Sequence, residues 1–340
     1  MKKNILLLTL LTVFISSNAT QAQNKETTTT PFVWEGANLY FLLTDRFNNG
    51  DPSNDIHYNR NKETGKLRGF MGGDVKGITQ KIEEGYFDQL GINAIWMTPL
   101  VEQIHEGTDE GTGFSYGFHG YWTKDWTALD PNFGTAEEVK KMVEKAHQHG
   151  IRIVFDGVIN HTGPVTPQDA VWPENWVRTT PACDYKNYKN TTACTLVANL
   201  PDILTESEKN VELPAALVEK WKKEGRYEQE VKELDAFFAR TGYPRAPKYY
   251  IIKWLTDYIT EYGIDGYRAD TTKHLEEGVW AEFKKQCDYT FTDWKKNNPR
   301  KVLDNNAFYT TGEVSGYNIS GGLYYDFGDK KVNYFANGFN

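Results

Sequence analysis

The stretch GIDGYRADTTKH, residues 263–274, follows the amphipathic run YYIIKWLTDYITEYG. The glycine at the end of that run predicts a helix terminus, because glycine readily adopts the left-handed conformation in which helices end. Residues 264–270 then read as a short buried strand, and alternate residues of a strand face the same way. Arg268 and Asp270 therefore share a face. A neighbouring guanidinium favours the ionised carboxylate that a nucleophile needs, although the same pair is also typical of a structural ion pair.

Composition and charge exclude one class of partner. The 340 residues are 39% hydrophobic and 25% charged, and the net charge is −8. Nucleic-acid binding needs a basic face, so we expect no nucleic-acid partner. Aromatic residues make up 14% of the chain, which suits stacking on the apolar faces of sugar rings and equally suits a large core.

The N-terminus reads as a targeting segment. Residues 1–22 combine two lysines, the short apolar run ILLLTLLTVFI and small residues up to Ala22, which is the pattern of a cleaved signal peptide. The polar residues 23–31 are expected to form a linker. We therefore expect a periplasmic or secreted protein with no membrane attachment after cleavage, because no later apolar run is long enough to span a bilayer.

Export would make disulfide bonds possible. Of the three cysteines, Cys183 and Cys194 flank a polar loop and can pair, which would leave Cys287 free. Three free thiols are the alternative, and the sequence does not decide between them.

Strands and helices alternate along most of the chain. Apolar runs that read as strands lie at residues 39–44, 94–100, 151–161, 264–270 and 308–315. Helical runs lie at residues 78–90, 135–150, 249–263 and 275–297. Continuous apolar strands that alternate with helices predict a parallel sheet covered on both faces. The fold class that we expect is α/β, a TIM (β/α)8 barrel of which about the first five to six strands are present.

Residues 162–246 interrupt this alternation and are too many for an ordinary connection. They carry Cys183 and Cys194, the run NLPDILTES and a charged helical run at residues 215–240. We interpret them as an inserted subdomain, called subdomain B, after the third strand. The barrel is then divided into a first part, residues 32–161, and a second part, residues 247–340.

Three of the predicted strands end in acidic groups: Asp156, Asp270 and Glu313. The carboxyl ends of barrel strands meet at one mouth, which would gather these carboxylates. Two carboxyl groups about 5 Å apart cleave a glycosidic bond with retention, one as nucleophile and one as general acid and then base. Asp270 suits the nucleophile, and Glu313, near other negative groups, suits the acid. Each acid alone is equally compatible with a strand-end cap or a surface charge.

Two loops carry further candidates. The run NNGDPSNDIHYNR, residues 48–60, and the run GGD, residues 72–74, cluster amide and carboxylate oxygens that suit a hard cation such as calcium. A plain turn-rich loop has the same composition. The run GFHGYW offers His119 as a donor to a ligand and Tyr121 as a stacking ring, although a lone histidine in an aromatic loop is more often structural.

The motifs DGVINH, GIDGYRADTTKH and TGEV resemble three of the four signature regions of the alpha-amylase family, glycoside hydrolase family 13. NLPDI resembles the additional region that this family carries in its inserted subdomain. The resemblance extends from about Phe32 to the last residue and is greatest to the periplasmic alpha-amylases of Gram-negative bacteria.

The resemblance implies a role for each matching residue. Asp270 would be the nucleophile, Glu313 the acid and base, and Arg268 the cation that orients the nucleophile. Six residues would line the sugar-binding subsites: His119, Tyr121, Asp156, His161, Lys273 and His274. The family's shared calcium ion would be bound by Asn160, Asp202 and the carbonyl oxygen of His274. A second calcium site found in some members would be formed by Asn49, Asp51, Asn54, Asp55, Gly72 and Asp74.

The implied function is calcium-dependent, retaining endohydrolysis of alpha-1,4-glucosidic bonds in starch and maltodextrins by a monomer. A transglycosylase, an alpha-1,6-acting relative and a non-catalytic glucan-binding homologue are the alternatives. The family's fourth region, with its His-Asp pair, has no counterpart before Asn340. We therefore expect the chain to be a fragment that lacks the third catalytic aspartate and is at best weakly active.

Overall fold

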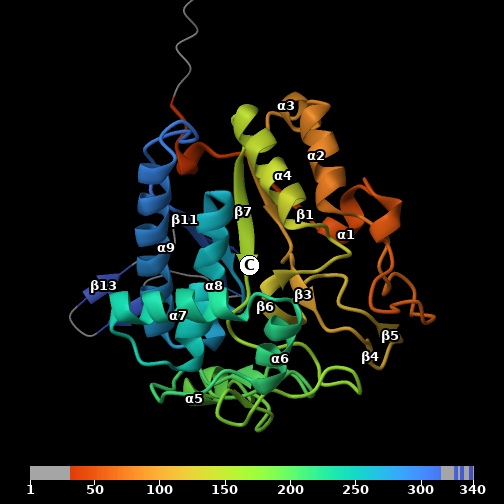
Figure 1. Cartoon of the computed structure of the whole chain (residues 1–340), viewed down its shortest axis with the longest axis vertical. Coiled ribbons are helices and arrows are strands. Elements are labelled where there is room, and N and C mark those ends of the chain that lie inside the picture. Colours follow the sequence, from red (N-terminus) through yellow and green to blue (C-terminus); the bar gives the residue numbers. More distant parts are fainter. Residues whose placement is uncertain (1–30, 315–324, 328–329, 333–336, 340) are drawn as a thin grey trace, which may run out of the picture. The chain divides into compact units, whose positions relative to one another are not determined.

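The apolar run that leads to Asp156 forms strand β7 (Arg152–Gly157), every residue of which is buried. A computed structural model describes residues 31–314, 325–327, 330–332 and 337–339 (Figure 1). All of the elements below lie in the unit Phe32–Asn340. The expected signal peptide lies outside the described residues, as does the expected linker except for its last residue.

Strand β7 lies inside a six-stranded sheet of the described residues, with the order β1-β2-β7-β10-β11-β14. Every neighbouring pair in this sheet is parallel. The other five strands are β1 (Leu39–Leu42), β2 (Ala94–Met97), β10 (Gly266–Ala269), β11 (Tyr309–Glu313) and β14 (Asn337–Phe339). The parallel order and the intervening helices confirm the expected fold class, an incomplete (β/α)8 barrel.

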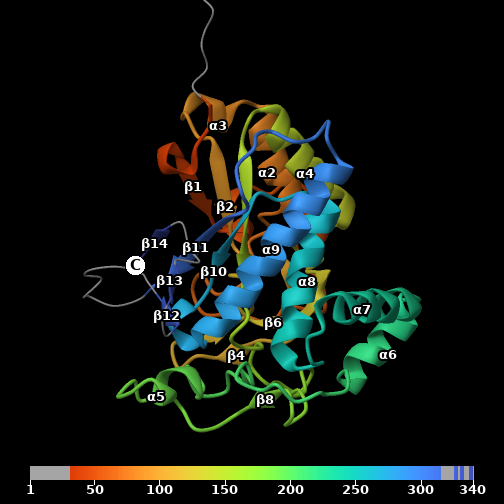
Figure 2. The same cartoon turned by 90° about the vertical axis from the view of Figure 1, so that its left-hand side faces the viewer.

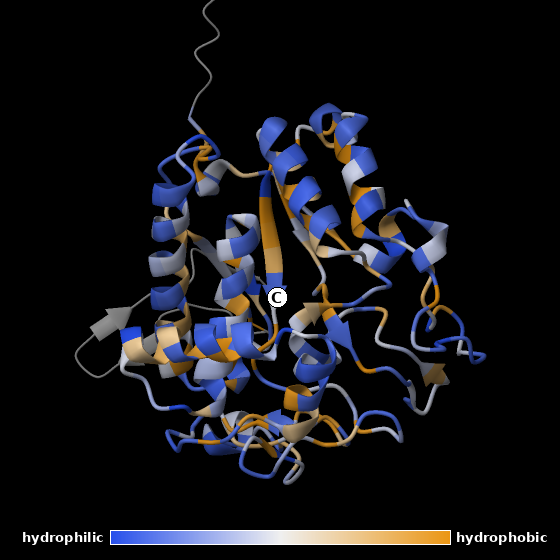
Figure 3. Cartoon of the chain, viewed as in Figure 1, coloured by the Kyte–Doolittle hydropathy of each residue, from blue (hydrophilic) through white to orange (hydrophobic). Residues whose placement is uncertain are grey.

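Helices α4 (Ala136–Gln148), α8 (Pro247–Tyr262) and α9 (Glu277–Asn297) lie against one face of the sheet, as Figure 2 shows. Helix α4 begins with the capping box of Thr135 and Glu138. Helix α8 ends at Gly263, whose φ of 72° is the left-handed conformation expected there. Hydrophobic residues run along β7, and Figure 3 shows them on the strand that these helices cover.

Two helical predictions were wrong in detail because a glycine interrupts each run. Residues 78–90 form two helices, α2 (Val75–Glu83) and α3 (Tyr86–Gln89), separated by Gly85 at φ 72°. Residues 215–240 also form two helices, α6 (Ala215–Lys223) and α7 (Tyr227–Thr241), with Gly225 at φ 73° between them. A left-handed residue cannot continue a right-handed helix.

The chain between β7 and α8 contains no strand of the main sheet within the described residues. It holds α6, α7, the short helix α5 (Lys189–Thr192) and a two-stranded sheet of β8 (Val177–Arg178) and β9 (Asp202–Ile203). The cysteines at positions 183 and 194 form a disulfide bond, and Cys287 is free and buried.

The remaining described elements are short apart from β6. Three further antiparallel pairs join β3 (Val101–Gln103) to β6 (Thr123–Leu129), β4 (Thr108–Asp109) to β5 (Phe114–Ser115), and β12 (Tyr325–Phe327) to β13 (Lys330–Val332). One helix, α1 (Thr44–Phe47), and three 3-10 turns complete the set: η1 (Trp34–Gly36), η2 (Pro52–Asn54) and η3 (Thr272–His274). No helix in the described ranges has the length and apolarity that a bilayer span requires.

A cluster of five tryptophans joins residues 162–246 to the strands and helices around them. Trp254 on α8 lies with its ring centre 6.5 Å from that of Trp126, 6.2 Å from Trp176 and 6.3 Å from Trp221. Trp172 packs edge-on against both Trp126 and Trp176. Trp126 belongs to β6 and Trp221 to α6, so this part of the core is shared between the barrel and residues 162–246.

Candidate active site

The guanidinium of Arg268 contacts three carboxylates at the carboxyl end of the sheet. Its Nη1 donates to Oδ1 of Asp270 at 2.6 Å and to Oδ1 of Asp156 at 2.8 Å. Its Nη2 lies 3.0 Å from Oε2 of Glu313. The strand register explains the convergence, because Arg268 pairs with Asp156 on β7 and with Thr311 on β11. The three acids that the sequence placed at strand ends are therefore gathered at one cation.

This cation is buried, and its charge is balanced by its neighbours. Arg268 is 4% exposed, while Asp156 and Asp270 are each 5% exposed. Burial by itself lowers the pKa of Arg268, but the charges of Asp156 and Asp270 raise it above its usual range. The guanidinium therefore stays charged among the carboxylates that surround it.

Asp156 is the most enclosed of the three acids. Besides two bonds from Arg268, its Oδ2 accepts hydrogen bonds from Tyr121 Oη at 2.9 Å and from Trp96 Nε1 at 3.0 Å. Burial raises the pKa of Asp156 to about 7, and the charge of Arg268 acts in the opposite direction. With four hydrogen bonds from three side chains, Asp156 is held as a support for Arg268 and Tyr121.

Glu313 is the most accessible of the three, with 32% of its side chain exposed. Its Oε2 also accepts a hydrogen bond from the backbone N–H of Thr271 at 2.9 Å. Thr271 has φ 49° and ψ 41°, a left-handed conformation that is rare for a β-branched residue. Backbone in such a conformation is concentrated at active sites and ligand clamps, and here it points an N–H group at Glu313.

His119, Tyr121 and His161 form one connected group beside Asp156. Nδ1 of His119 accepts from the backbone N–H of Tyr121 at 3.0 Å, and Nε2 of His161 donates to the Tyr121 carbonyl at 3.1 Å. The His119 and Tyr121 rings are stacked, with centres 5.8 Å apart. Burial and the neighbouring His161 lower the pKa of His119 to about 4, so its ring is neutral at pH 7.

Lys273 and His274 lie in η3, directly after the strand that carries Arg268. Burial lowers the pKa of His274, and the hydrogen bond to Thr191 and the charges of Glu313 and Asp270 act in the opposite direction. Its Nδ1 lies 3.1 Å from the carbonyl oxygen of Thr191, between β8 and β9. Lys273 is exposed.

The residues expected to hold the shared calcium ion partly come together. Asn160 donates through Nδ2 to Oδ1 of Asp202, and its own Oδ1 is buried without a hydrogen-bond partner. An orphaned amide oxygen beside a carboxylate is a donor set that suits calcium. Asp202 also accepts a bond from Arg178 Nε at 2.8 Å, which already neutralises part of its charge. Asn160 and Asp202 fit the ion, whereas His274 makes its hydrogen bond to Thr191 through its ring.

The second expected calcium set is also gathered, around Asp74. This carboxylate accepts backbone N–H bonds from Gly50 at 3.1 Å and Asp51 at 2.8 Å, and a side-chain bond from Asn54 at 3.2 Å. Oδ1 of Asn54 is buried without a partner. Asp51 is paired with Lys76 at 2.9 Å, so a cation here would compete with an ammonium group.

The other three members of that set lie close to one another. Asn49 Nδ2 donates to Asp55 Oδ1 at 2.7 Å, and a Cβ atom on Gly72 would collide with both of these side chains. Within the described ranges, no three His, Cys, Asp or Glu side chains converge as a metal-binding cluster. Both candidate calcium sets combine asparagine amide oxygens with aspartate carboxylates.

Two contact residues were missed at the sequence level. Trp96 binds Asp156 through Nε1, and its ring lies 5.3 Å from the guanidinium carbon of Arg268. Its position near the end of the second strand, in AIWMTPL, was the available signal. Thr271 was missed because a left-handed threonine leaves no mark in the sequence pattern.

Comparison with known families decides the relationship. A family profile described as "Alpha amylase, catalytic domain" matches residues 41–316. The chain belongs to the alpha-amylase family. The match includes β2, β7, β10, β11 and the second half of β1, and it ends before β14. All three acids around Arg268 lie within it.

Individual proteins match different shares of this chain. The periplasmic alpha-amylase of Escherichia coli (strain K12) is 35% identical over an alignment 363 positions long, which covers 90% of this chain and 51% of that protein. The chain thus spans about half the length of that relative. A cyclomaltodextrin glucanotransferase of Bacillus sp. (strain 38-2) is 34% identical over 145 residues, which cover 40% of this chain and 19% of that enzyme.

A solved structure of the family agrees with the fold. The alpha-amylase of Geobacillus thermoleovorans, crystallised in complex with acarbose, matches with a TM-score of 0.56 and 26% identity. The match covers 84% of this chain and 48% of that one.

Proposed function

We propose that this chain carries the acid pair of an exported, calcium-dependent alpha-amylase that cleaves internal alpha-1,4 bonds of starch and maltodextrins with retention. The observation that carries the proposal is the single buried guanidinium that contacts Asp156, Asp270 and Glu313. Membership of the alpha-amylase family and the similarity to a periplasmic alpha-amylase support it.

In the proposed reaction, Asp270 attacks the anomeric carbon. Its Oδ1 is held by Arg268, so the attack falls to Oδ2. Glu313 gives its proton to the departing glycosidic oxygen, which leaves as a sugar hydroxyl, and a covalent glycosyl ester forms on Asp270. Glu313 then removes a proton from water, which attacks the same carbon and releases the sugar with retained configuration.

The neighbouring residues are assigned to binding. Tyr121 presents its ring beside the acids while its hydroxyl is fixed on Asp156, so it can stack on the sugar that is attacked. His119 is neutral at pH 7 and can share a hydrogen bond with a sugar hydroxyl. His161 holds the Tyr121 backbone, and Lys273 and His274 contact the leaving-group side.

Calcium is assigned a structural role. Asn160 and Asp202 would hold the shared ion between the barrel and subdomain B, and the group around Asp74 would hold a second one. The buried, unpartnered amide oxygens of Asn160 and Asn54 support both assignments. A bound cation would cross-link these loops, and no step of the reaction requires it.

A transglycosylase is the second candidate, and the similarity to a cyclomaltodextrin glucanotransferase favours it. The two functions share the glycosyl ester and differ in whether water or a sugar hydroxyl resolves it. Product analysis on starch, maltodextrin and pullulan separates hydrolysis, transfer and alpha-1,6 cleavage.

Substitution of the nucleophile tests the proposal directly. We expect Asp270→Asn to lower turnover at least about a thousand-fold while glucan binding is retained, because the amide keeps the shape but cannot form the ester. Asp288→Asn on α9 is the matched control and should leave turnover unchanged. Unchanged turnover in Asp270→Asn would refute the assignment, and glucan binding without turnover in the parent chain would favour a non-catalytic homologue.

A further inference from the structure

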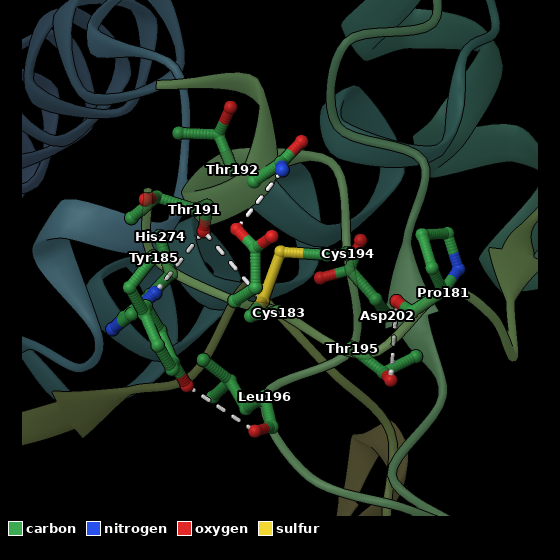
Figure 4. Close-up of a disulfide and its surroundings, with 12 residues drawn as sticks. Pro181, Cys183, Tyr185, Thr191, Thr192, Cys194, Thr195, Leu196, Asp202 and His274 are labelled. Carbon is green, nitrogen blue, oxygen red and sulfur yellow. Dashed lines mark hydrogen bonds between the residues drawn. A yellow bond between two sulfur atoms is a disulfide. The ribbon is translucent and has the colours of Figure 1, made fainter. Parts of the chain in front are cut away.

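The disulfide bond between Cys183 and Cys194 closes a loop that reaches the candidate active site. Figure 4 shows this loop, with Thr191 and His274 joined by a hydrogen bond beside the two sulfur atoms. Sγ of Cys183 lies 4.0 Å from the same Thr191 carbonyl oxygen. The disulfide therefore packs directly behind the group that contacts the histidine.

The hydrogen bond determines which nitrogen of the His274 ring carries the proton. A carbonyl oxygen can only accept, so Nδ1 must be the donor. The neutral ring then presents Nε2 as its acceptor, because the hydrogen bond of one ring nitrogen sets the state of the other. Without the Thr191 carbonyl, the partly buried imidazole would lose the contact that fixes its orientation and its tautomer.

Two tyrosines on the loop have matched exposure but different partners. Tyr185 is 55% exposed, and its ring packs edge-on against His274 with centres 5.8 Å apart. Tyr188 is 53% exposed, and its hydroxyl donates to Glu277 at 2.7 Å. Only the first of these touches the histidine ring, so the pair offers a test and its control on one loop.

The loop is also held internally. The backbone N–H of Tyr185 donates to Asn190 at 3.1 Å, and those of Thr191 and Thr192 donate to Tyr188 at 3.0 Å. The backbone N–H of Cys183 donates to the Thr195 carbonyl at 2.9 Å, beyond the disulfide. The Thr191 carbonyl thus belongs to a cross-linked turn.

We propose that the loop of residues 183–194 is the positioning element for the leaving-group side of the cleft, acting through His274. This inference rests on the proposed function, because His274 matters to catalysis only if a glucan is cleaved. The disulfide holds the Thr191 carbonyl, the carbonyl fixes the ring and its tautomer, and Nε2 then accepts a hydrogen bond from a hydroxyl of the leaving sugar. The loop therefore raises kcat/KM for substrates whose leaving group is a sugar. It does not affect kcat/KM when the leaving group has no hydroxyls.

The first test compares two substrates in the protein with and without the disulfide. In Cys183→Ser/Cys194→Ser, kcat/KM for maltoheptaose should fall about 10-fold, which is typical of a small misplacement of a substrate-positioning group. The value for direct release of 4-nitrophenolate from a 4-nitrophenyl maltooligosaccharide, in which the departing aryl group lacks sugar hydroxyls, should stay within about 2-fold. Dithiothreitol should reproduce the loss in the parent and change nothing in the double variant. Equal losses on both substrates would mean a general folding role and overturn the inference.

The second test asks whether the effect passes through the histidine. In a His274→Ala background the disulfide should no longer affect maltoheptaose cleavage, because residues that act through one contact are non-additive. A full additional loss would contradict the proposal, and His274→Asn serves if the alanine variant does not fold. Tyr185→Leu should reproduce part of the loss, whereas Tyr188→Leu should not.

A measurement independent of turnover separates this inference from the proposed function. Nitrogen-15 NMR of the imidazole, assigned by its absence in His274→Ala, should show Nδ1 protonated in the parent and a mixture of tautomers in the double cysteine variant. An unchanged spectrum refutes the positioning role whether or not the chain is active. A loop-dependent tautomer in a chain that cleaves neither substrate would refute the proposed function alone.

Discussion

Nη2 of Arg268 on β10 lies 3.0 Å from Oε2 of Glu313 on the neighbouring strand β11. The same guanidinium binds Asp270 through its other terminal nitrogen. The two acids assigned to catalysis are therefore held by opposite ends of one rigid, planar group, which limits how far apart they can move. This arrangement defines the first prediction.

Arg268→Lys should be far from conservative. A lysine ammonium is a compact point charge on a flexible stem and cannot serve three carboxylates in the fixed geometry of the guanidinium. Incomplete pairing of buried charges costs on the order of 3–5 kcal/mol, so we expect a lower free energy of unfolding and at least about a hundred-fold loss of turnover. Denaturant unfolding and starch hydrolysis measure the two effects. Arg245→Lys, at an exposed ion pair with Asp235, is the control, and equal behaviour of both variants would contradict the assigned role.

His119 predicts a pH dependence of stability. Its pKa is lowered by burial to about 4 in the folded protein, against 6.5 for the ordinary side chain. Between these values the unfolded chain binds the extra proton, so stability should fall as pH drops from 6.5 to 4. Replacing His119 with Asn, whose oxygen can still accept from the Tyr121 backbone, should flatten this part of the profile by up to about 3 kcal/mol. Thermal melts at pH 4, 5 and 6.5 measure it, and parallel profiles would show that His119 is not the group responsible.

Calcium removal should lower the melting temperature. A ligand present at about 100 times its dissociation constant stabilises a protein by about 2.7 kcal/mol, which corresponds to several degrees here. We expect Asn160→Ala to lose the part of the chelator response that comes from the shared site and Asn160→Asp to keep it, because the aspartate retains an oxygen ligand. Asn54→Ala tests the second site in the same way. If the parent melts at one temperature with and without chelator, both calcium assignments are wrong.

Thr271→Gly should keep turnover and raise stability, whereas Thr271→Ala should not raise stability, because alanine bears the same steric penalty in the left-handed region. Thr271 occupies the left-handed region, in which glycine is free of the steric penalty that other residues bear. The glycine variant keeps the N–H that binds Glu313, so we expect turnover within a few-fold of the parent and stability raised by up to about 1 kcal/mol. A large loss of turnover in Thr271→Gly would point to a role for the hydroxyl, which is buried without a hydrogen-bond partner.

The sequence predicted the parts of the site that depend on periodicity. Strand alternation placed Arg268 and Asp270 on one face, and barrel geometry brought Asp156 and Glu313 to the same end. It could not predict the Thr191 carbonyl at His274, because that contact depends on the path of an inserted loop and involves a backbone atom. The helix breaks at Gly85 and Gly225 were missed because an isolated glycine costs a helix only about 1 kcal/mol, and hydrophobic periodicity continued across both.

Half of the chain's ten tryptophans belong to the cluster around Trp254. These rings come from both the barrel and residues 162–246, so the protein contains its own optical probe of the contact between them. Separation of the two would hydrate several indoles at once and shift the intrinsic fluorescence emission to longer wavelength. Intrinsic fluorescence therefore distinguishes loosening of this contact from structural changes confined to the acids around Arg268, without any added label.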